Sequence, residues 1–178
     1  MESSLDYFDK IYCINLPERT DRWEKVQEEF DKLGIKDRVI RRNGIRTGGL
    51  PWLGCTMAHL EILHHANNER ILIFEDDVKF VDKAKEHLSR VIEDLKNIDW
   101  TMFYLGGNIC GKMQQVSYGL ARLTHAQSTH AYALDRGVAE QLLSDKRINL
   151  VEKELDRVYA EEAAQTHTNE PPYMGLSD

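Results

Sequence analysis

The sequence has few cysteines, and no two of them are close together. The chain of 178 residues contains three, Cys13, Cys55 and Cys110, which are far apart and odd in number. No pair has the short spacing of a zinc site or a redox motif. We therefore expect three reduced and mostly buried thiols.

The sequence also lacks a long apolar run and an excess of positive charge. No run approaches the roughly 20 residues that span a bilayer, and residues 1–10 include acidic residues where a signal peptide would be apolar. We therefore expect no transmembrane segment and a cytoplasmic protein. The net charge of −7 argues against a broad nucleic-acid-binding face. An acidic protein can still bind a diphosphate when a divalent cation mediates the contact.

The remaining composition is that of one folded domain. The hydrophobic fraction is 42%, the charged fraction is 30%, and there are three tryptophans, as in ordinary globular proteins. The sequence shows no internal repeat and no dividing linker. We expect a single domain over residues 1–178, with an irregular tail from about residue 161.

Strands and helices alternate along the first half of the sequence. Apolar runs predict strands at residues 11–16, 39–40 and 71–74, the last covered on both faces. A helix capped by Asp21 and stopped by Gly34 follows the first strand. After a glycine-rich loop at residues 43–54, a second helix is expected from near Thr56, with Met57 on its apolar face.

The second half continues the alternation. Asp82 is expected to cap a helix that reaches Leu95, and a strand at residues 102–105 is expected to end at Gly106-Gly107. Short β-prone pieces fill residues 112–134, and helices are expected after Asp135 and over residues 151–160. This order predicts an α/β fold with three layers, α/β/α, around a mostly parallel central sheet. Ligands bind such sheets beyond the carboxyl ends of the strands.

Three adjacent acids, Glu75, Asp76 and Asp77, follow the most apolar strand. Two unit charges about 4 Å apart repel by about 4 kcal/mol at an effective dielectric of 20, so the acids need a compensating group. Basic neighbours, a helix N-terminus, solvent or a hard cation such as Mn²⁺ or Mg²⁺ can supply it. In an extended segment Glu75 and Asp77 could face one ligand together, and Asp76 would then either point away or support the metal ligands from behind. The alternative is a solvated turn or the cap of the next helix.

Four segments in a fixed order resemble glycosyltransferase family 25, which includes lipooligosaccharide and collagen galactosyltransferases. They are residues 11–23 (IYCINLPERTDRW), 54–59 (GCTMAH), 73–78 (IFEDDV) and 129–134 (THAYAL). The resemblance implies a GT-A-like fold, a nucleotide-sugar donor and usually an inverting transfer. It also implies that Glu75 and Asp77 hold the metal ion.

The resemblance further implies binding residues for the donor and acceptor. Asn15 and Leu16 would lie near the nucleotide, and Arg19 and Arg22 would reach phosphate unless they are solvated residues of the first helical turn. His59 either lies beside the donor pocket or is a structural histidine that ties its helix to the sheet. In the same way, His130 either lines the acceptor side or packs as an ordinary strand residue.

An inverting transfer needs a general base for the acceptor hydroxyl. Asp156 is the nearest match to a late aspartate of the family, although Glu-Leu stands where the family usually has a proline. The alternative is a solvated acid on a helix. The chain is also shorter than typical family members, mainly in regions that shape the donor lid and acceptor pocket.

Two functions therefore stay open. The first is a metal-dependent transferase that moves a hexose, galactose or glucose, from a UDP-sugar to a saccharide or glycoprotein acceptor. The second is a catalytically silent module of the same fold that binds nucleotide sugars. A metal-dependent phosphotransferase is disfavoured because the glycine-rich phosphate loop is absent.

Overall fold

An eight-stranded sheet forms the centre of the described structure. The computed structural model describes residues 4–144 and 173–176, and the strand order is β2-β1-β3-β7-β4-β8-β6-β5. The strands are β1 (Lys10–Asn15), β2 (Val39–Asn43), β3 (Ile71–Glu75), β4 (Met102–Ile109), β5 (Met113–Ser117), β6 (Leu120–Leu123), β7 (Ala126–Leu134) and β8 (Tyr173–Leu176). The helices are η1 (Ser4–Tyr7), α1 (Thr20–Leu33), η2 (Lys36–Arg38), α2 (Pro51–His64), α3 (Ala84–Leu95) and α4 (Val138–Ser144).

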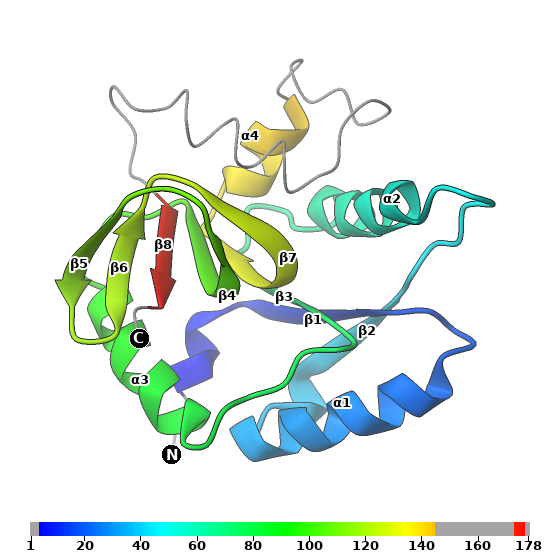
Figure 1. Ribbon diagram of the computed structural model, residues 1–178, viewed down its shortest axis with the longest axis horizontal. Coiled ribbons are helices and arrows are strands. Elements are labelled where there is room, and N and C mark those ends of the chain that lie inside the picture. The colour runs from blue at the N-terminus through cyan, green and yellow to red at the C-terminus, as the bar shows by residue number, and fades with distance from the viewer. Residues whose placement is uncertain (1–3, 145–172, 177–178) are drawn as a thin grey trace.

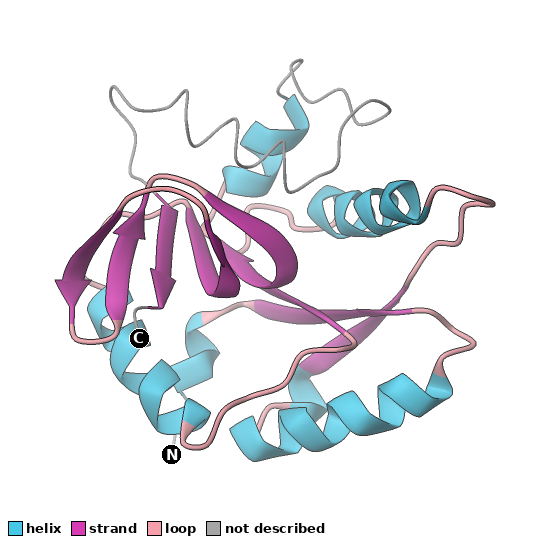
Figure 2. Ribbon diagram, viewed as in Figure 1, coloured by secondary structure: helices cyan, strands magenta, loops and turns pink. Residues whose placement is uncertain are grey.

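Most strands of this sheet run in one direction. β1 is parallel to both of its neighbours, β2 and β3, and β4 is parallel to β8. β7 runs antiparallel between β3 and β4, so β4 keeps the direction of β3. Helices α1 and α3 lie on one face of the sheet, and α2 and α4 lie on the other (Figures 1 and 2). The predicted three-layer α/β fold with a mostly parallel sheet is confirmed.

The first core layer lies between the sheet and helices α1 and α3. Helix α1 buries Val26, Phe30 and Leu33 against the sheet, and the Phe30 ring lies 5.5 Å from that of Phe74 on β3. The helix ends at Gly34, whose φ of 72° is the left-handed conformation that glycine adopts without strain. The helical spacing and the glycine stop predicted this element correctly.

The second core layer lies between the sheet and helices α2 and α4. Ala58, Ile62 and Leu63 of α2 pack against Tyr12 and Ile73 of the sheet. Residues 71–74 of β3 have no exposed surface, and they alternate between the two core layers. The prediction of a strand covered on both faces is therefore confirmed.

Two helix starts differ from the sequence prediction. The N-cap of α1 is Arg19 rather than Asp21, and that of α3 is Lys83 rather than Asp82; neither makes a side-chain capping bond. Asp21 instead lies in the first turn of α1, where its carboxylate binds Arg19. The expected caps are wrong: Asp21 lies inside the first turn of α1 and binds Arg19, and the N-cap of α3 is the residue after Asp82.

The start of α2 and the end of β4 also differ from the sequence prediction. Helix α2 begins at Pro51, which occupies its first turn, rather than near Thr56. Proline is tolerated there because the first N–H groups of a helix have no partner within the helix. Strand β4 continues through Gly106-Gly107 to Ile109, with irregular pairing to β7 at the glycines. The glycines therefore mark a β-bulge and not the end of the strand.

The last part of the chain is described only in part. The helix predicted over residues 151–160, together with Asp156, lies outside the described residues. Within the expected irregular tail, residues 173–176 form β8, which pairs with β4 and β6. Among the described residues, none of the helices combines the length and apolarity required to cross a membrane.

Candidate functional site

The carboxyl ends of β1 and β3 bring two polar segments together at one edge of the sheet. The register pairs Ile14 with Glu75, so Asn15 lies beside the acids that follow β3. Strand β3 ends at Glu75, and the Val78 N–H donates to the Glu75 carbonyl at 3.3 Å across a turn that contains Asp76 and Asp77. The acids thus lie where an open α/β sheet binds its ligands.

Asp76 and Asp77 converge on one arginine of helix α1. The Nη1 atom of Arg22 lies 2.8 Å from Asp76 Oδ1 and 3.6 Å from Asp77 Oδ2. The side chain of Asp76 is 10% exposed, whereas that of Asp77 is 56% exposed. One carboxylate is therefore held tightly within the fold, and the other is open to solvent beside it.

Glu75 does not join this pair of aspartates. It accepts hydrogen bonds from α2 and β7, whereas Asp76 and Asp77 contact α1 on the opposite face of the sheet. The structure therefore places Asp77 with Asp76 rather than with Glu75, whereas Glu75 and Asp77 were expected to face one ligand; which acids hold a metal ion stays a prediction. Asp77 does not lie on the same side as Glu75 because the strand ends at Glu75 and the chain turns there, so side chains no longer alternate between the two faces.

Asn15 anchors the acidic turn to strand β1. It is 1% exposed, and its Nδ2 donates to Asp76 Oδ2 at 2.6 Å and to the Arg19 carbonyl at 3.1 Å. Arg41 of β2 donates to Asn15 Oδ1, and its guanidinium stacks 4.9 Å from the centre of the Trp23 ring. The sequence patterns did not indicate Arg41, which lies in the middle of β2 opposite Cys13 of β1.

The other predicted donor residues lie close to the same edge. Leu16 is half-buried directly after β1, and its carbonyl accepts from the Arg19 N–H at 2.8 Å. The Arg19 side chain binds Asp21 through two hydrogen bonds of 2.8 Å, which lower the pKa of Asp21 to about 2. Of the two predicted arginines, Arg22 therefore contacts the acids, and Arg19 is paired elsewhere.

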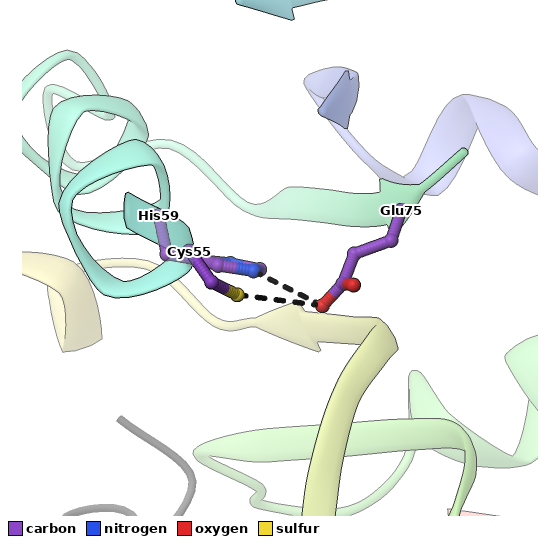
Figure 3. Close-up of side chains that lie close together, drawn as sticks. All are labelled: Cys55, His59 and Glu75. Carbon is purple, nitrogen blue, oxygen red and sulfur yellow. Dashed lines mark hydrogen bonds and ion pairs between the residues drawn. The ribbon is translucent and has the colours of Figure 1, made fainter. Parts of the chain in front are cut away.

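A second polar cluster surrounds Glu75 on the other face of the sheet (Figure 3). His59 is fully buried; its Nδ1 lies 2.9 Å from the Tyr132 hydroxyl and its Nε2 lies 3.3 Å from Glu75 Oε1. Thr129 donates to the same oxygen at 2.8 Å, and Cys55 Sγ lies 3.9 Å from it. His59 thus ties α2 to β3 and β7, which confirms its structural interpretation; its donor role stays a prediction.

The charge of Glu75 is stabilised by its neighbours. Burial acts to raise its pKa, but the hydrogen bond and charge of His59, the Thr129 hydroxyl and the charge of His130 outweigh it, so the pKa is lowered. His130 is half-buried on β7 and packs next to Gly106, where a Cβ would lie 3.0 Å from its Nε2. Its predicted place on the acceptor side stays a prediction.

The cysteines differ in exposure. Cys13 is buried, Cys55 is half-buried and Cys110 is exposed, and all three are free thiols. The expectation of mostly buried thiols is thus wrong for Cys110, which follows the exposed end of β4. The contact of Cys55 with Glu75 was missed as well. The spacing of Cys55 and His59, four residues apart on a predicted helix, was a usable signal.

The aspartate pair suits a hard divalent cation. Such ions take oxygen ligands and commonly join one or two carboxylates to substrate phosphates. Oxygens of Asp76 and Asp77 already lie around a single cationic nitrogen of Arg22, so both can reach one positive centre. The residues present therefore fit Mn²⁺ or Mg²⁺ with Asp76 and Asp77 as its carboxylates.

Comparison with known proteins agrees with the sequence motifs. The family model described as glycosyltransferase family 25 (LPS biosynthesis protein) matches residues 47–131. Human inactive glycosyltransferase 25 family member 3 is 26% identical over 173 residues, which are 78% of this chain and 29% of that protein. Procollagen galactosyltransferase 2 of Mus musculus is 24% identical over 129 residues, 56% of this chain and 21% of that protein. The chain thus spans less than a third of either relative.

Solved structures share the fold at low sequence identity. A glycosyltransferase involved in glycosylation of the major capsid of PBCV-1 has a TM-score of 0.57 and 14% identity, over 93% of this chain and 79% of that chain. A putative glucose-1-phosphate thymidylyltransferase from Bacillus anthracis has a TM-score of 0.54 and 14% identity, over 98% and 72%. These structures confirm the predicted GT-A-like α/β fold. The family model and the curated relatives together show that the chain is similar to glycosyltransferase family 25.

Proposed function

We propose that this chain is a glycosyltransferase domain that moves a hexose, galactose or glucose, from a UDP-sugar to a hydroxyl group of a saccharide or glycoprotein. The observation that carries the proposal is the convergence of Asp76 and Asp77 on one cationic nitrogen at the carboxyl edge of β1 and β3. The relation to family 25 supports the transferase class.

The site offers what a nucleotide diphosphate requires. A chain with a net charge of −7 needs a local positive centre to hold a diphosphate. Asp77 with Asp76 would hold Mn²⁺ or Mg²⁺, and the bound ion would supply this centre and offset the charge of the departing diphosphate. Arg22 then stands free to contact a phosphate oxygen, and Asn15 and Leu16 border the nucleotide.

The acceptor side of the proposal rests on the sequence. An inverting transfer requires a base that removes the proton from the attacking hydroxyl, and Asp156 is the proposed base. His130 and Thr129 lie on β7 beside Glu75, at the same edge as the aspartates, and are the proposed border of the acceptor pocket.

A catalytically silent module that binds nucleotide sugars is the second candidate. The observation in its favour is that the human relative, and those of rat and cow, are described as inactive or probably inactive family members. Both candidates bind the donor, and only the first one cleaves it.

A thermal-shift panel followed by a UDP-release assay separates the candidates. We expect UDP to raise the melting temperature in the presence of Mn²⁺ and to have little effect with EDTA. Asp76→Asn and Asp77→Asn should lose this response, whereas Asp37→Asn, an exposed acid on η2, should keep it. Slow release of UDP from UDP-galactose or UDP-glucose then selects the enzyme, and its absence selects the silent module.

Glu75→Gln tests the metal ligands that the sequence predicted. If this variant loses the Mn²⁺ response while Asp76→Asn keeps it, Glu75 and Asp77 hold the ion, as the family resemblance implies. A wild-type protein that shows no manganese-dependent response to any uridine nucleotide would contradict both candidates.

A further inference from the structure

Three side chains with different donor atoms surround one point on the face opposite the aspartates (Figure 3). Cys55 and His59 lie one helical turn apart on α2, and Glu75 ends β3. Their Sγ, imidazole nitrogen and carboxylate oxygen all lie within 4.8 Å of one another. Among the residues that the structure describes, no other set of three His, Cys, Asp or Glu side chains converges in this way.

The distances match metal ligands better than direct hydrogen bonds. His59 Nε2 and Cys55 Sγ lie 3.3 Å and 3.9 Å from Glu75 Oε1, whereas an ordinary N–H···O bond is about 2.9 Å long. Around a tetrahedral Zn²⁺ ion, ordinary bond lengths place nitrogen and oxygen ligands about 3.4 Å apart and sulfur and oxygen ligands about 3.6 Å apart. Both separations from Glu75 Oε1 are therefore close to those that such an ion requires, and the third, between sulfur and nitrogen, is within 4.8 Å.

The surrounding contacts orient these donor atoms. The Tyr132 hydroxyl lies 2.9 Å from His59 Nδ1. When an ion takes the place of the proton on Nε2, an N–H on Nδ1 that donates to this hydroxyl would leave the Nε2 lone pair for the ion, on the side of Glu75. The Thr129 hydroxyl donates to Glu75 Oε1 at 2.8 Å and fixes the carboxylate. Hydrogen bonds of this kind to the second nitrogen of a histidine and to a ligating carboxylate are usual around protein metal sites.

We propose that Cys55, His59 and Glu75 form a binding site for a borderline-soft divalent cation of the Zn²⁺ class. The Cys55 thiol loses its proton to solvent as the ion binds, and the resulting thiolate, the neutral imidazole and the Glu75 carboxylate become the ligands. The two negative ligands balance the two positive charges of the ion. A fourth position is open to water.

This site differs in chemistry from the aspartate pair. Sulfur and imidazole nitrogen favour Zn²⁺, Co²⁺ and related ions, whereas carboxylate oxygens alone suit Mg²⁺ and Mn²⁺. The Cys55–His59–Glu75 site therefore does not depend on the proposed transferase function. It also joins α2 to β3, so a bound ion stabilises the folded chain by an amount that grows with the logarithm of its affinity.

Cobalt titration of the full chain, after treatment with a chelator, tests this proposal. We expect one Co²⁺ per chain, with visible d–d bands of a four-coordinate ion and an ultraviolet thiolate-to-cobalt charge-transfer band, both removed by added Zn²⁺. Cys55→Ser should lose the charge-transfer band, and Cys110→Ser, which removes an exposed thiol, should keep it. Tyr132→Phe should weaken cobalt binding about 10–100-fold, the usual effect of losing a hydrogen bond to a ligating histidine.

The result can also go against the proposal. A wild-type chain without the charge-transfer band, or a band that persists in Cys55→Ser, would overturn it, as would a band lost in Cys110→Ser. Glu75→Gln provides a second ligand variant, and circular dichroism confirms that each variant is folded. Loss of the cobalt bands in Asp77→Asn would show that the metal binds at the aspartates instead.

Discussion

Asn15 Nδ2 donates a hydrogen bond of 2.6 Å to Asp76 Oδ2 and so joins the last residue of β1 to the turn after β3. The two residues are 61 positions apart in the sequence. The parallel pairing of β1 with β3 ends both strands at the same edge, which brings the amide to the carboxylate. This bond aims Asp76 at Arg22 on α1 and away from Glu75.

Asp76 and Asp77 should differ in their contribution to stability. Asp76→Asn loses a charge-assisted bond to Arg22 at a nearly buried position, and we expect the free energy of unfolding to fall by about 1–2 kcal/mol. Asp77→Asn should cost clearly less, because its carboxylate is exposed and 3.6 Å from the arginine. Urea denaturation without added metal measures both values. Equal losses would contradict the tight placement of Asp76.

The sequence predicted the elements that have strong local signals. Helix α1 has apolar residues at helical spacing and ends at Gly34, and residues 71–74 form one apolar run, so neither needed tertiary information. Met57 shows the limit of periodicity, since it was expected on the buried face of α2 and is 42% exposed, whereas the polar Thr56 is buried.

The sequence predicted the place of the site in the fold, but not the directions in which its side chains point. Acids after a buried strand predicted the correct edge of the sheet, because parallel strands end together there. The direction of each side chain depended on the turn at Asp76 and Asp77 and on Arg22 across the interface with α1. The pairing of Cys55 and His59 with Glu75 required the packing of α2 on the sheet, which no local pattern encodes.

Removing the Tyr132 hydroxyl should destabilise the fold. Tyr132→Phe leaves Nδ1 of the buried His59 without its hydrogen bond, and such a loss costs about 1–3 kcal/mol. Because a domain of this size changes by about 2–4 °C per kcal/mol, the melting temperature should fall by several degrees. Tyr118→Phe is the matched control, since that side chain is 79% exposed. Similar melting temperatures for the two variants would refute the role of the hydroxyl.

Gly54 is expected to tolerate no side chain. A Cβ at this position would lie 2.0 Å from the carbonyl oxygen of Ile45, which is backbone and cannot move aside easily. Gly54→Ala should therefore lower the free energy of unfolding by about 1–3 kcal/mol through overpacking, despite the better helix propensity of alanine. Gly48→Ala, in the loop before α2, meets no atom within 4 Å and should be nearly neutral. Chemical denaturation of the two variants compares them directly, and a neutral Gly54→Ala would show that α2 does not pack closely on residue 45.

Cys13 should make the fold sensitive to alkaline pH. Burial in the core, with a further effect from the charge of Asp76, raises the pKa of its thiol above the ordinary value of 9.0. The unfolded chain releases this proton near pH 9 while the folded chain retains it. The stabilisation is therefore complete below pH 9 and is lost as pH rises further, by up to about 1.4 kcal/mol per pH unit. Denaturation at a series of pH values should give a shallower alkaline slope for Cys13→Ala, whereas Cys110→Ala, at an exposed thiol, should keep the wild-type slope.

A thiol reagent at neutral pH should correspondingly modify Cys110 first and Cys13 only upon unfolding, and rapid modification of Cys13 in the native protein would rule out its burial.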